Sequence, residues 1–458
     1  MSVSKLKEML KPGIHAHLVG IGGVSMFPLS EMLMDRGIIV TGSDMRQSDN
    51  VKYLQSQGVK VVIGHLPESV LGADLVIRTA AAHDDNPEIL SARANGIPVF
   101  ERAEALGALM GDYRHALCVS GTHGKTTTTS MCTHICMVAE LDPTIMIGGN
   151  LPLLGTGYRI GGGDTIVLES CEYCNSFLSF RPTVAVILNV EEDHMDFFHN
   201  LGEIQQSFRT FAELVPDGGC VVANADDRNT MDALKGIDRP LITFGLEQPA
   251  DVKAQNITFD KGLARFDIVS HGAFLCHVEL SVPGRHNILN ALAAAAAAQF
   301  MGIRPETIAA GLSQFGGAER RFEYRGDCNG AKVYDDYAHH PGELHTLLST
   351  AEQLGYERII CAFQPHTYTR TIAFFDDFVR ELSRPTRTVL MEIYPAREEN
   401  LTGLSSKDLA EKIPGAVYCA TLEETEQTLR SIARPGDLVL TVGAGELNVV
   451  AGRLTADN

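Results

Sequence analysis

A glycine-rich segment near residue 120 has the residue types and spacing of a phosphate-binding loop. It reads Val119-Ser-Gly-Thr-His-Gly-Lys-Thr-Thr127, follows an apolar run and precedes a Thr-rich stretch typical of a helix. In such a loop backbone N–H groups surround phosphates, Lys125 neutralises the outer ones, and the Thr126 hydroxyl suits Mg²⁺. A glycine usually stands where Val119 does, so this is a shortened variant. A chance Gly-Lys-Thr turn is the alternative, which the strand–loop–helix context disfavours.

A second glycine loop lies close to the N-terminus. Gly20-Ile-Gly-Gly-Val-Ser25 follows an expected strand and precedes an expected helix, and Asp44 stands at the end of the next strand. This arrangement suits a pyrophosphate at the helix start and a ribose on the carboxylate. Ser25 replaces the third glycine of the dinucleotide pattern. A nucleotide-type ligand and a merely tight strand–helix turn are therefore equally supported.

Acidic and imidazole side chains follow two further apolar runs, at 164–168 and 183–188. Residues just past strand ends line the ligand crevice of an open α/β sheet, so both clusters are candidates for a magnesium site beside the phosphate loop. Histidine is an unusual magnesium ligand, and His194 as a helix cap or core residue stays open. The candidates are Glu169, Glu172, Asn189, Glu191, Glu192, Asp193, His194 and Asp196.

Cys171 and Cys174 form a CxxC pair next to these acidic residues. Such a pair can bind zinc or undergo redox chemistry. No second pair stands at a matching spacing, which favours two free thiols.

Composition limits the function classes. Lys and Arg total 38 and Asp and Glu 57 in 458 residues, so the net charge is 38 − 57 = −19. An acidic balance argues against nucleic acid and anionic lipid as partners. With no signal peptide, no ~20-residue apolar span and scattered cysteines, we expect a soluble cytoplasmic protein without membrane contact.

The elements that must position these residues repeat an α/β pattern in three units. Apolar strands alternate with helices, which indicates parallel sheets covered on both faces. We place the units at 1–112, 113–319 and 320–458. Strands are expected at 17–21, 38–41, 59–63, 75–79, 117–120, 164–168, 183–188, 220–223, 332–334, 358–363, 388–393 and 438–442, antiparallel strands at 250–282, and helices at 27–36, 343–354 and 372–382.

Several motifs in fixed order resemble the Mur ligase family over residues 15 to 450. The chain is most similar to the members that add L-alanine. The motifs are Gly20-Ile-Gly-Gly23, Gly121-Thr-His-Gly-Lys-Thr-Thr-Thr-Thr129, Asn189-Val-Glu-Glu-Asp-His-Met-Asp196, His286-Asn-Ile-Leu-Asn290, Arg320-Arg-Phe-Glu323, Asp335-Asp-Tyr-Ala-His-His-Pro341, Gln364-Pro-His-Thr-Tyr-Thr-Arg370 and Tyr394-Pro-Ala-Arg397.

The resemblance implies a three-domain fold: a Rossmann-like domain for a UDP-sugar, a central P-loop domain for ATP and Mg²⁺, and a Rossmann-like C-terminal domain for the amino acid. It also implies roles for particular residues. These are Gly22, Asp44 and His65 for the UDP-sugar; Gly121, Thr122, His123, Gly124, Lys125, Thr126, Thr127, Asn287, Asn290, Arg321 and Asp336 for ATP; Thr126, Glu172 and His194 for the metal; Tyr337, His366 and Arg370 for the amino acid; and Lys125, His194 and Arg321 for catalysis.

The implied reaction is ATP-dependent joining of L-alanine to the lactyl carboxylate of UDP-N-acetylmuramate, through an acyl phosphate. Sister ligases carry a carbamylated lysine after the Asp193-His-Met-Asp196 block, and no lysine occurs here between Met195 and Pro216. The family commonly has acidic residues at 171 and 174, so the electrostatics of the metal site can differ in this chain. A murein-tripeptide recycling ligase, a nicotinamide-dependent oxidoreductase with a regulatory P-loop, and an ATP-hydrolysing switch are the alternatives. The oligomeric state stays open.

Overall fold

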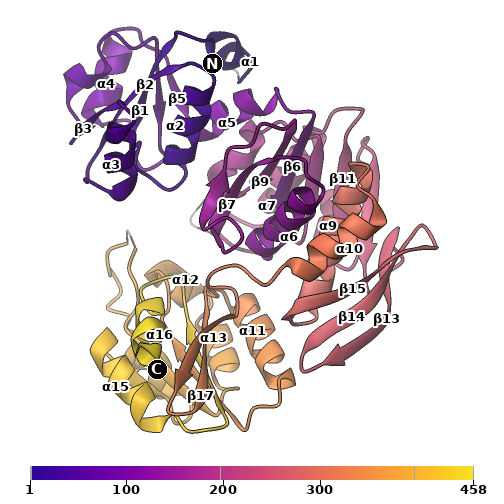
Figure 1. The fold of residues 1–458 in the computed structure, drawn as a ribbon. Coiled ribbons are helices and arrows are strands. Elements are labelled where there is room, and N and C mark those ends of the chain that lie inside the picture. Colours follow the sequence, from indigo (N-terminus) through magenta and orange to yellow (C-terminus); the bar gives the residue numbers. More distant parts are fainter. Residues whose placement is uncertain (1–2, 196, 397, 457–458) are drawn as a thin grey trace.

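A computed structural model describes residues 3–195, 197–396 and 398–456, and within them the strands form three sheets. Asp196 and Arg397, which belong to two of the motifs above, lie outside the described residues. The three sheets follow one another along the chain and, with their helices, make three bodies (Figure 1). The fold is the expected three-domain α/β architecture.

The N-terminal sheet is parallel, with strand order β3-β2-β1-β4-β5. Strand order reverses beside β1, so the crevice at its carboxyl end lies where the first glycine loop begins. Its strands are β1 (His15–Val19), β2 (Ile39–Asp44), β3 (Lys60–Ile63), β4 (Leu75–Arg78) and β5 (Val99–Glu101), and its helices are α1 (Val3–Met9), α2 (Met26–Asp35), α3 (Asp49–Ser56), η1 (Pro67–Val70), α4 (Pro87–Ala94) and α5 (Arg102–Met110).

The central sheet has the order β15-β14-β13-β12-β11-β10-β6-β9-β7-β8. Its β13–β15 end is antiparallel, as the sequence predicts for 250–282. Its strands are β6 (His115–Ser120), β7 (Thr144–Leu151), β8 (Thr156–Arg159), β9 (Thr165–Glu169), β10 (Val184–Ile187), β11 (Cys220–Asn224), β12 (Leu241–Gly245), β13 (Val252–Asp260), β14 (Leu263–Ser270) and β15 (Ala273–Pro283). Its helices are α6 (Lys125–Val138), η2 (Tyr173–Ser179), α7 (Leu201–Glu213), α8 (Arg228–Ala233), α9 (His286–Phe300) and α10 (Pro305–Gln314).

The C-terminal sheet has the order β16-β17-β21-β18-β19-β20, parallel except for β16. Every residue of β21 is buried, as expected of an apolar strand covered on both faces. The strands are β16 (Glu323–Cys328), β17 (Ala331–Asp336), β18 (Arg358–Phe363), β19 (Arg387–Met391), β20 (Val417–Cys419) and β21 (Asp437–Val442), and the helices are α11 (Pro341–Gln353), α12 (Tyr368–Ala373), α13 (Phe375–Leu382), α14 (Ser406–Lys412), α15 (Leu422–Ile432) and α16 (Asn448–Thr455).

The predicted single helix at 372–382 is wrong. The chain forms α12 and α13 with a break at Phe374, whose φ of −116° and ψ of 28° are not helical. Arg370 lies inside α12. Its side chain is only 13% exposed, which excludes a surface arginine.

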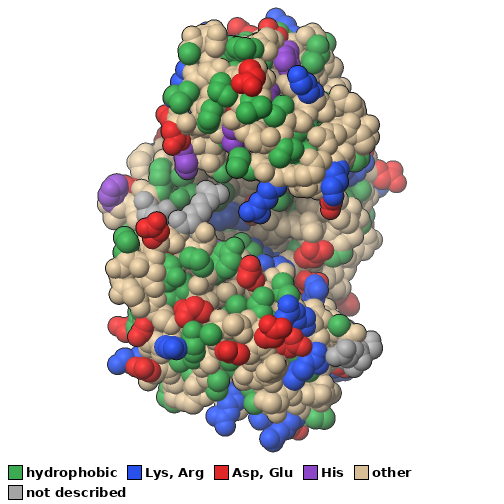
Figure 2. Space-filling model, turned by 90° about the vertical axis from the view of Figure 1, so that its left-hand side faces the viewer, with side chains coloured by type: hydrophobic (Ala, Val, Ile, Leu, Met, Phe, Trp, Pro, Cys, Tyr) green, Lys and Arg blue, Asp and Glu red, His purple; other side chains and the backbone are tan. Residues whose placement is uncertain are grey.

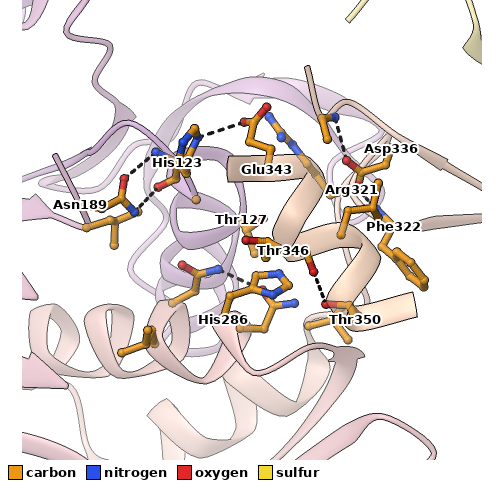
Figure 3. Close-up of a pocket in the computed structure, with 18 of the residues that line it drawn as sticks. His123, Thr127, Asn189, His286, Arg321, Phe322, Asp336, Glu343, Thr346 and Thr350 are labelled. Carbon is orange, nitrogen blue, oxygen red and sulfur yellow. Dashed lines mark hydrogen bonds and ion pairs between the residues drawn. The ribbon is translucent and has the colours of Figure 1, made fainter. Parts of the chain in front are cut away.

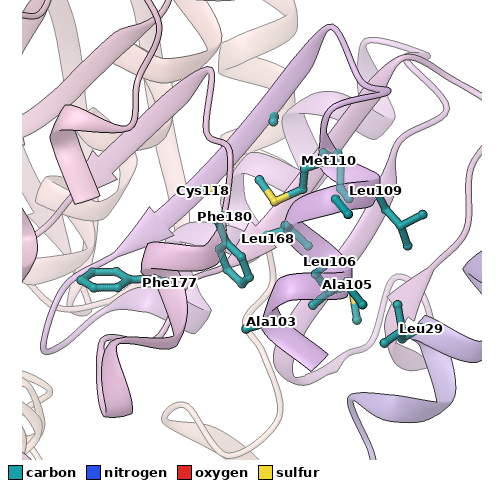
Figure 4. Packing of buried hydrophobic residues seen from close by; sticks show 14 of the residues in the cluster. Leu29, Ala103, Ala105, Leu106, Leu109, Met110, Cys118, Leu168, Phe177 and Phe180 are labelled. Carbon is teal, nitrogen blue, oxygen red and sulfur yellow. The ribbon is translucent and has the colours of Figure 1, made fainter. Parts of the chain in front are cut away.

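The N-terminal and central domains share one apolar core. Helix α5 carries Ala105, Leu106 and Leu109 into contact with a cluster that also includes Phe177 and Phe180 of the central domain (Figure 4). A Cβ on Gly107 would lie 1.8 Å from the Ser179 carbonyl oxygen, so a glycine is needed for this close approach. The two domains are therefore joined by packing as well as by the chain.

Candidate active site

The phosphate loop joins β6 to α6, as the sequence predicts. Gly124 precedes the helix with φ 83°, a left-handed conformation that favours glycine. A Cβ there would also lie 2.9 Å from Asn290 Oδ1 on α9. The loop is fixed by Asn189, whose Oδ1 accepts from the His123 N–H at 2.7 Å and whose Nδ2 donates to the His123 carbonyl at 3.1 Å (Figure 3).

Lys125 is held by its own loop and by a buried carboxylate. Its Nζ donates to the Thr122 carbonyl at 3.0 Å and lies 3.1 Å from Glu172 Oε2. Burial alone would lower the pKa of Lys125, but the carboxylates of Glu172 and Glu169 outweigh it and raise that pKa above its usual range. The side chain is therefore a fixed positive charge where a phosphoryl group would sit.

The predicted metal residues Thr126, Glu172 and His194 lie around this lysine. The Thr126 hydroxyl donates to Glu169 Oε1 at 3.1 Å, whereas Glu172 pairs with Lys125. His194 Nε2 is 3.9 Å from Glu172 Oε1. Glu169, which the sequence places among the acidic candidates without a role, is thus the carboxylate beside Thr126.

This donor set fits Mg²⁺. A threonine hydroxyl and the carboxylates of Glu169 and Glu172 supply the hard oxygen ligands that magnesium prefers, with room for water. Glu172 is 2% exposed, and a cation beside it would offset the cost of burying its charge.

A cavity between the central and C-terminal domains is lined by seven of the eleven predicted ATP residues; Gly121, Thr122, Lys125 and Thr126 are not among its lining residues (Figure 3). Arg321 of the C-terminal domain reaches across, and its Nη2 donates to Thr126 Oγ1 at 3.3 Å. Burial raises the pKa of Asp336 to about 6, although its carboxylate accepts from the Phe322 and Ala338 backbone N–H groups. The predicted residues lining the cavity are His123, Gly124, Thr127, Asn287, Asn290, Arg321 and Asp336.

The predicted amino-acid residues are linked through His339, which sequence reasoning left without a role. The rings of Tyr337 and His339 lie 5.4 Å apart and those of His339 and His366 5.9 Å apart. His366 Nδ1 is 3.5 Å from Arg370 Nη1. His339 lies within the 335–341 motif, so the sequence contains a pattern that could have identified it.

Arg370 also contacts the central domain. Its Nη2 lies 3.0 Å from Asp193 Oδ1, and the Asp193 side chain is 9% exposed. Burial opposes the charge of Asp193, but His194 and Arg370 outweigh it and hold the pKa of that carboxyl well below its usual range. The residues predicted to bind the amino acid and those predicted to bind the metal are therefore adjacent across the domain boundary.

Of the predicted UDP-sugar residues, Gly22 contacts Asp44, and His65 contacts Ser43, the neighbour of Asp44 in β2. The Gly22 N–H donates to Asp44 Oδ2 at 2.9 Å, so Asp44 braces the first glycine loop. A Cβ on Gly22 would lie 2.6 Å from Val51 Cγ2, which explains a glycine in this packed turn. His65 also pairs through Nδ1 with buried Glu88 at 2.9 Å.

Glu88 holds a buried polar network behind the N-terminal sheet. Its carboxylate accepts from the Ser43 hydroxyl at 2.5 Å and lies 3.4 Å from His17 Nε2. Glu88→Gln should lower the free energy of unfolding by about 1–3 kcal/mol, because buried donors lose a charged acceptor. Denaturant titration measures this change, with Glu68→Gln, an exposed glutamate nearby, as the control.

The same variant has a pH signature. Burial would raise the pKa of Glu88, but the His17 and Ser43 bonds outweigh it and lower that pKa. Because the carboxyl has a lower pKa in the folded than in the unfolded protein, its charge stabilises the fold above the unfolded pKa of about 4.3. That stabilisation is lost as the pH falls through the folded pKa. The stability gap between parent and variant should persist at pH 7 and narrow below about pH 4. A constant gap down to acid would contradict the role of the charge.

A second recess lies between the N-terminal and central domains. Val24, Ser25 and Asn50 line it from one side, and Glu169 and Cys171 from the other. In the space-filling view a hollow separates the upper and lower lobes, with Lys and Arg side chains around its mouth (Figure 2). The recess thus extends from the first glycine loop to Glu169, which accepts from the Thr126 hydroxyl next to the phosphate loop.

Cys171 and Cys174 form no disulfide in the structure, and both are exposed. Desolvation by the surrounding protein and the charge of Glu172 raise the pKa of the Cys171 thiol to about 11. At neutral pH this group is a thiol, which attacks a disulfide slowly. Cys171→Ser with Cys174→Ser should leave turnover and metal content within about twofold of the parent. Stoichiometric zinc in the parent, lost with activity in the variant, would contradict this reading.

Comparison with known proteins decides the family. Family models match the Mur ligase family catalytic domain at residues 15–114, the Mur ligase middle domain at 119–298 and the Mur ligase glutamate ligase domain at 320–445. The chain is 43% identical over 447 residues to a UDP-N-acetylmuramate–L-alanine ligase of Caldanaerobacter subterraneus subsp. tengcongensis, covering 96% of this chain and 97% of the relative. The chain belongs to the Mur ligase family.

Solved structures of the Mur ligase family agree. A UDP-N-acetylmuramate-alanine ligase of Thermotoga maritima superimposes with a TM-score of 0.79 at 28% identity, covering 96% of this chain and 98% of that one. A murein peptide ligase of Psychrobacter arcticus gives a TM-score of 0.69 at 26% identity, covering 96% and 98%. No helix among the described residues of this Mur ligase is long and apolar enough to cross a membrane.

Proposed function

We propose that this Mur ligase joins L-alanine to the lactyl carboxylate of UDP-N-acetylmuramate, with ATP converted to ADP and phosphate. The observation that carries the proposal is the similarity, over nearly the whole chain, to relatives that bear this activity in their names. The geometry supports it, because Glu172 pairs with Lys125 of the nucleotide loop, its neighbour Cys171 lines the recess beside the first glycine loop, and Arg370 pairs with Asp193 across the domain boundary.

The chemistry requires an activated carboxylate, because a carboxylate is a poor electrophile. A lactyl oxygen attacks the ATP γ-phosphorus, the bond to the β,γ-bridging oxygen breaks, and an acyl phosphate and ADP form. The alanine amine then attacks the acyl carbon through a tetrahedral intermediate, losing a proton, and inorganic phosphate leaves. Each step builds negative charge on oxygen, which positioned cations stabilise.

The residues fit these needs. Lys125 and Arg321 would neutralise the transferring phosphoryl group from the central and C-terminal domains, which meet at Thr126. Thr126 and Glu172, with Glu169 beside them, would hold Mg²⁺, which supplies charge neutralisation when bound. His194 stands at the edge of this set, 3.9 Å from Glu172, where a second cation or the phosphoryl oxygens would lie.

The remaining predicted residues would bind the substrates. Asn287, Asn290 and Asp336 line the cavity proposed for the nucleoside of ATP, as do Gly124 and Thr127. With Gly121 and Thr122 of the same loop, Gly124 and Thr127 would surround the phosphates. Gly22 belongs to the loop proposed for the UDP-sugar, Asp44 accepts from its N–H, and His65 lies beside Ser43 on the same strand end. Arg370, with His366 and Tyr337, would bind the alanine carboxylate and leave the uncharged amine free to attack.

Domain boundaries near 112 and 319 fit this division of roles. Each falls between two sheets, after β5 and α5 and after α10 respectively. We also propose a cytoplasmic location, because ATP and UDP-linked sugars are intracellular metabolites.

Product analysis separates this function from the murein-tripeptide recycling ligase, which shares the chemistry but uses a larger amine. The purified protein would be incubated with ATP, UDP-N-acetylmuramate and equal concentrations of L-alanine and tripeptide. We expect mass spectrometry to detect the UDP-N-acetylmuramoyl-alanine product in large excess. A dominant tripeptide product would make the recycling reaction the correct one.

A further inference from the structure

Three side chains, apart from the proposed magnesium ligands Thr126, Glu169 and Glu172, converge at the boundary between the central and C-terminal domains. They are His123 of the phosphate loop, Glu191 after β10, and His340 immediately before α11. One potential metal-ligand atom from each lies within 4.8 Å of the other two. The residues are far apart in sequence, so the site exists only where the two domains meet.

Because Gly342 has no side chain, the space that these three side chains surround is open. A Cβ built on it would lie 3.3 Å from Glu191 Oε2 and 3.5 Å from both His123 Nε2 and His340 Nδ1. Two imidazole nitrogens and a carboxylate oxygen therefore face one small volume, which the missing side chain keeps open.

The ring nitrogens have the orientation that a metal ligand requires. His123 Nδ1 lies 3.3 Å from Glu343 Oε1 (Figure 3), and its Nε2 lies 3.5 Å from Glu191 Oε2, so a cation bound at Nε2 would displace a proton there while Nδ1–H stays on Glu343. A carboxylate behind a ligating histidine is the usual outer partner of such a ligand. Among the described residues the buried His123 Nε2 makes no well-aligned hydrogen bond, and the carboxylate that it faces, 3.5 Å away, is that of Glu191.

His340 also turns a lone pair toward this space. Its side chain is buried, with 6% of the residue exposed. Its Nδ1 accepts a long hydrogen bond of 3.2 Å from the Gly342 N–H, so Nδ1 is unprotonated in this arrangement. That bond is weak enough for a cation to replace it.

We propose that His123, Glu191 and His340 bind a divalent cation of the zinc class, with water as a further ligand. Two imidazoles and one carboxylate form a mixed nitrogen and oxygen set that suits Zn²⁺ or Co²⁺ better than Mg²⁺. The bound ion ties the phosphate loop to the C-terminal domain and holds the two domains in the arrangement seen here. This inference does not depend on the substrates proposed above.

Cobalt titration of the full-length, metal-free and nucleotide-free protein tests the site. The Cys171→Ser, Cys174→Ser background removes thiolate ligands, and Co²⁺ reports its own coordination through visible absorption. We expect one saturable site that Zn²⁺ displaces. His340→Gln and, independently, Gly342→Ala should abolish it, and Glu343→Gln should weaken it by about 10–100-fold as an outer partner.

Two controls distinguish this site from other cation binding. Glu172→Gln removes a proposed magnesium ligand and should leave the cobalt spectrum unchanged. His277→Gln removes an exposed histidine that lies 2.7 Å from Asp267 and 3.8 Å from Glu279, and should also change nothing. Circular dichroism confirms that each variant is folded.

Three results would overturn the proposal. The first is no saturable cobalt site, in which case His123 only bridges two carboxylates as an imidazolium. The second is binding that persists in both folded variants, His340→Gln and Gly342→Ala. The third is binding lost in Glu172→Gln alone, which would place the ion among the proposed magnesium ligands.

Discussion

Lys125→Ala is expected to lower kcat by about 10²–10³ or more at saturating substrates, because the transferring phosphoryl group loses its fixed positive charge. The loop backbone still surrounds phosphate, so nucleotide binding weakens less than turnover. Phosphate-release kinetics measure kcat, and fluorescence titration with an ATP analogue measures binding. Turnover within threefold of the parent would contradict the assignment of the loop.

Lys125 pairs with Glu172 in the structure, so the effect of leaving Glu172 unpaired needs its own control. The variant leaves Glu172 buried without its cation, which can destabilise the loop. Lys125→Ala with Glu172→Gln removes both charges and should restore the melting temperature without restoring kcat. Lys52→Ala, which breaks an exposed pair with Asp49, should change neither quantity. Recovery of kcat in the double variant would reduce Lys125 to a structural role.

Arg370→Ala is expected to raise KM for L-alanine by roughly 10–100-fold, since a buried charge-assisted pair contributes about 1.5–3 kcal/mol. KM for ATP and for UDP-N-acetylmuramate should hardly move, because those ligands are assigned to other domains. Steady-state kinetics with each substrate varied in turn provide the three constants. An equal rise in all three would show that Arg370 only supports the structure.

Asp193 supplies the matched control for this prediction. Arg370 pairs with Asp193 across the domain boundary, so Arg370→Ala removes this ion pair as well as any contact with alanine, and the two effects must be measured separately. Asp193→Asn removes the pair and keeps the guanidinium, and we expect a smaller rise in KM for alanine than in Arg370→Ala. Arg370→Lys should lie between the parent and Arg370→Ala, because an ammonium keeps the charge and loses the planar fork. Equal effects of Asp193→Asn and Arg370→Ala would assign Arg370 to the pair alone.

The strands were predictable because buried parallel strands are short apolar runs that end at glycine turns. The run at 358–363 matches β18, and those at 220–223 and 438–442 differ from β11 and β21 by one residue at one end. The break between α12 and α13 was not predictable, because the apolar positions of 372–382 continue a helical period through Phe374. Backbone conformation there is set by packing that the local pattern does not encode.

The site was predictable as a set of residues and less so as a set of contacts. The phosphate loop identifies Lys125 and Thr126, but two carboxylates three positions apart compete for the role beside Thr126. Which of them faces the hydroxyl depends on where β9 ends and η2 begins, and the structure places Glu169 there. The pair of Arg370 with Asp193 joins two domains and has no signature in sequence spacing.

The most direct test of the central claim is phosphate release with each substrate omitted in turn. With ATP, UDP-N-acetylmuramate and L-alanine together, the purified protein should release phosphate continuously, and omission of any one should reduce the rate to background. Addition of NADPH should cause no change in its absorbance. Sustained phosphate release from ATP alone would instead indicate a nucleotide switch, and oxidation of NADPH an oxidoreductase; either result would contradict the ligase assignment.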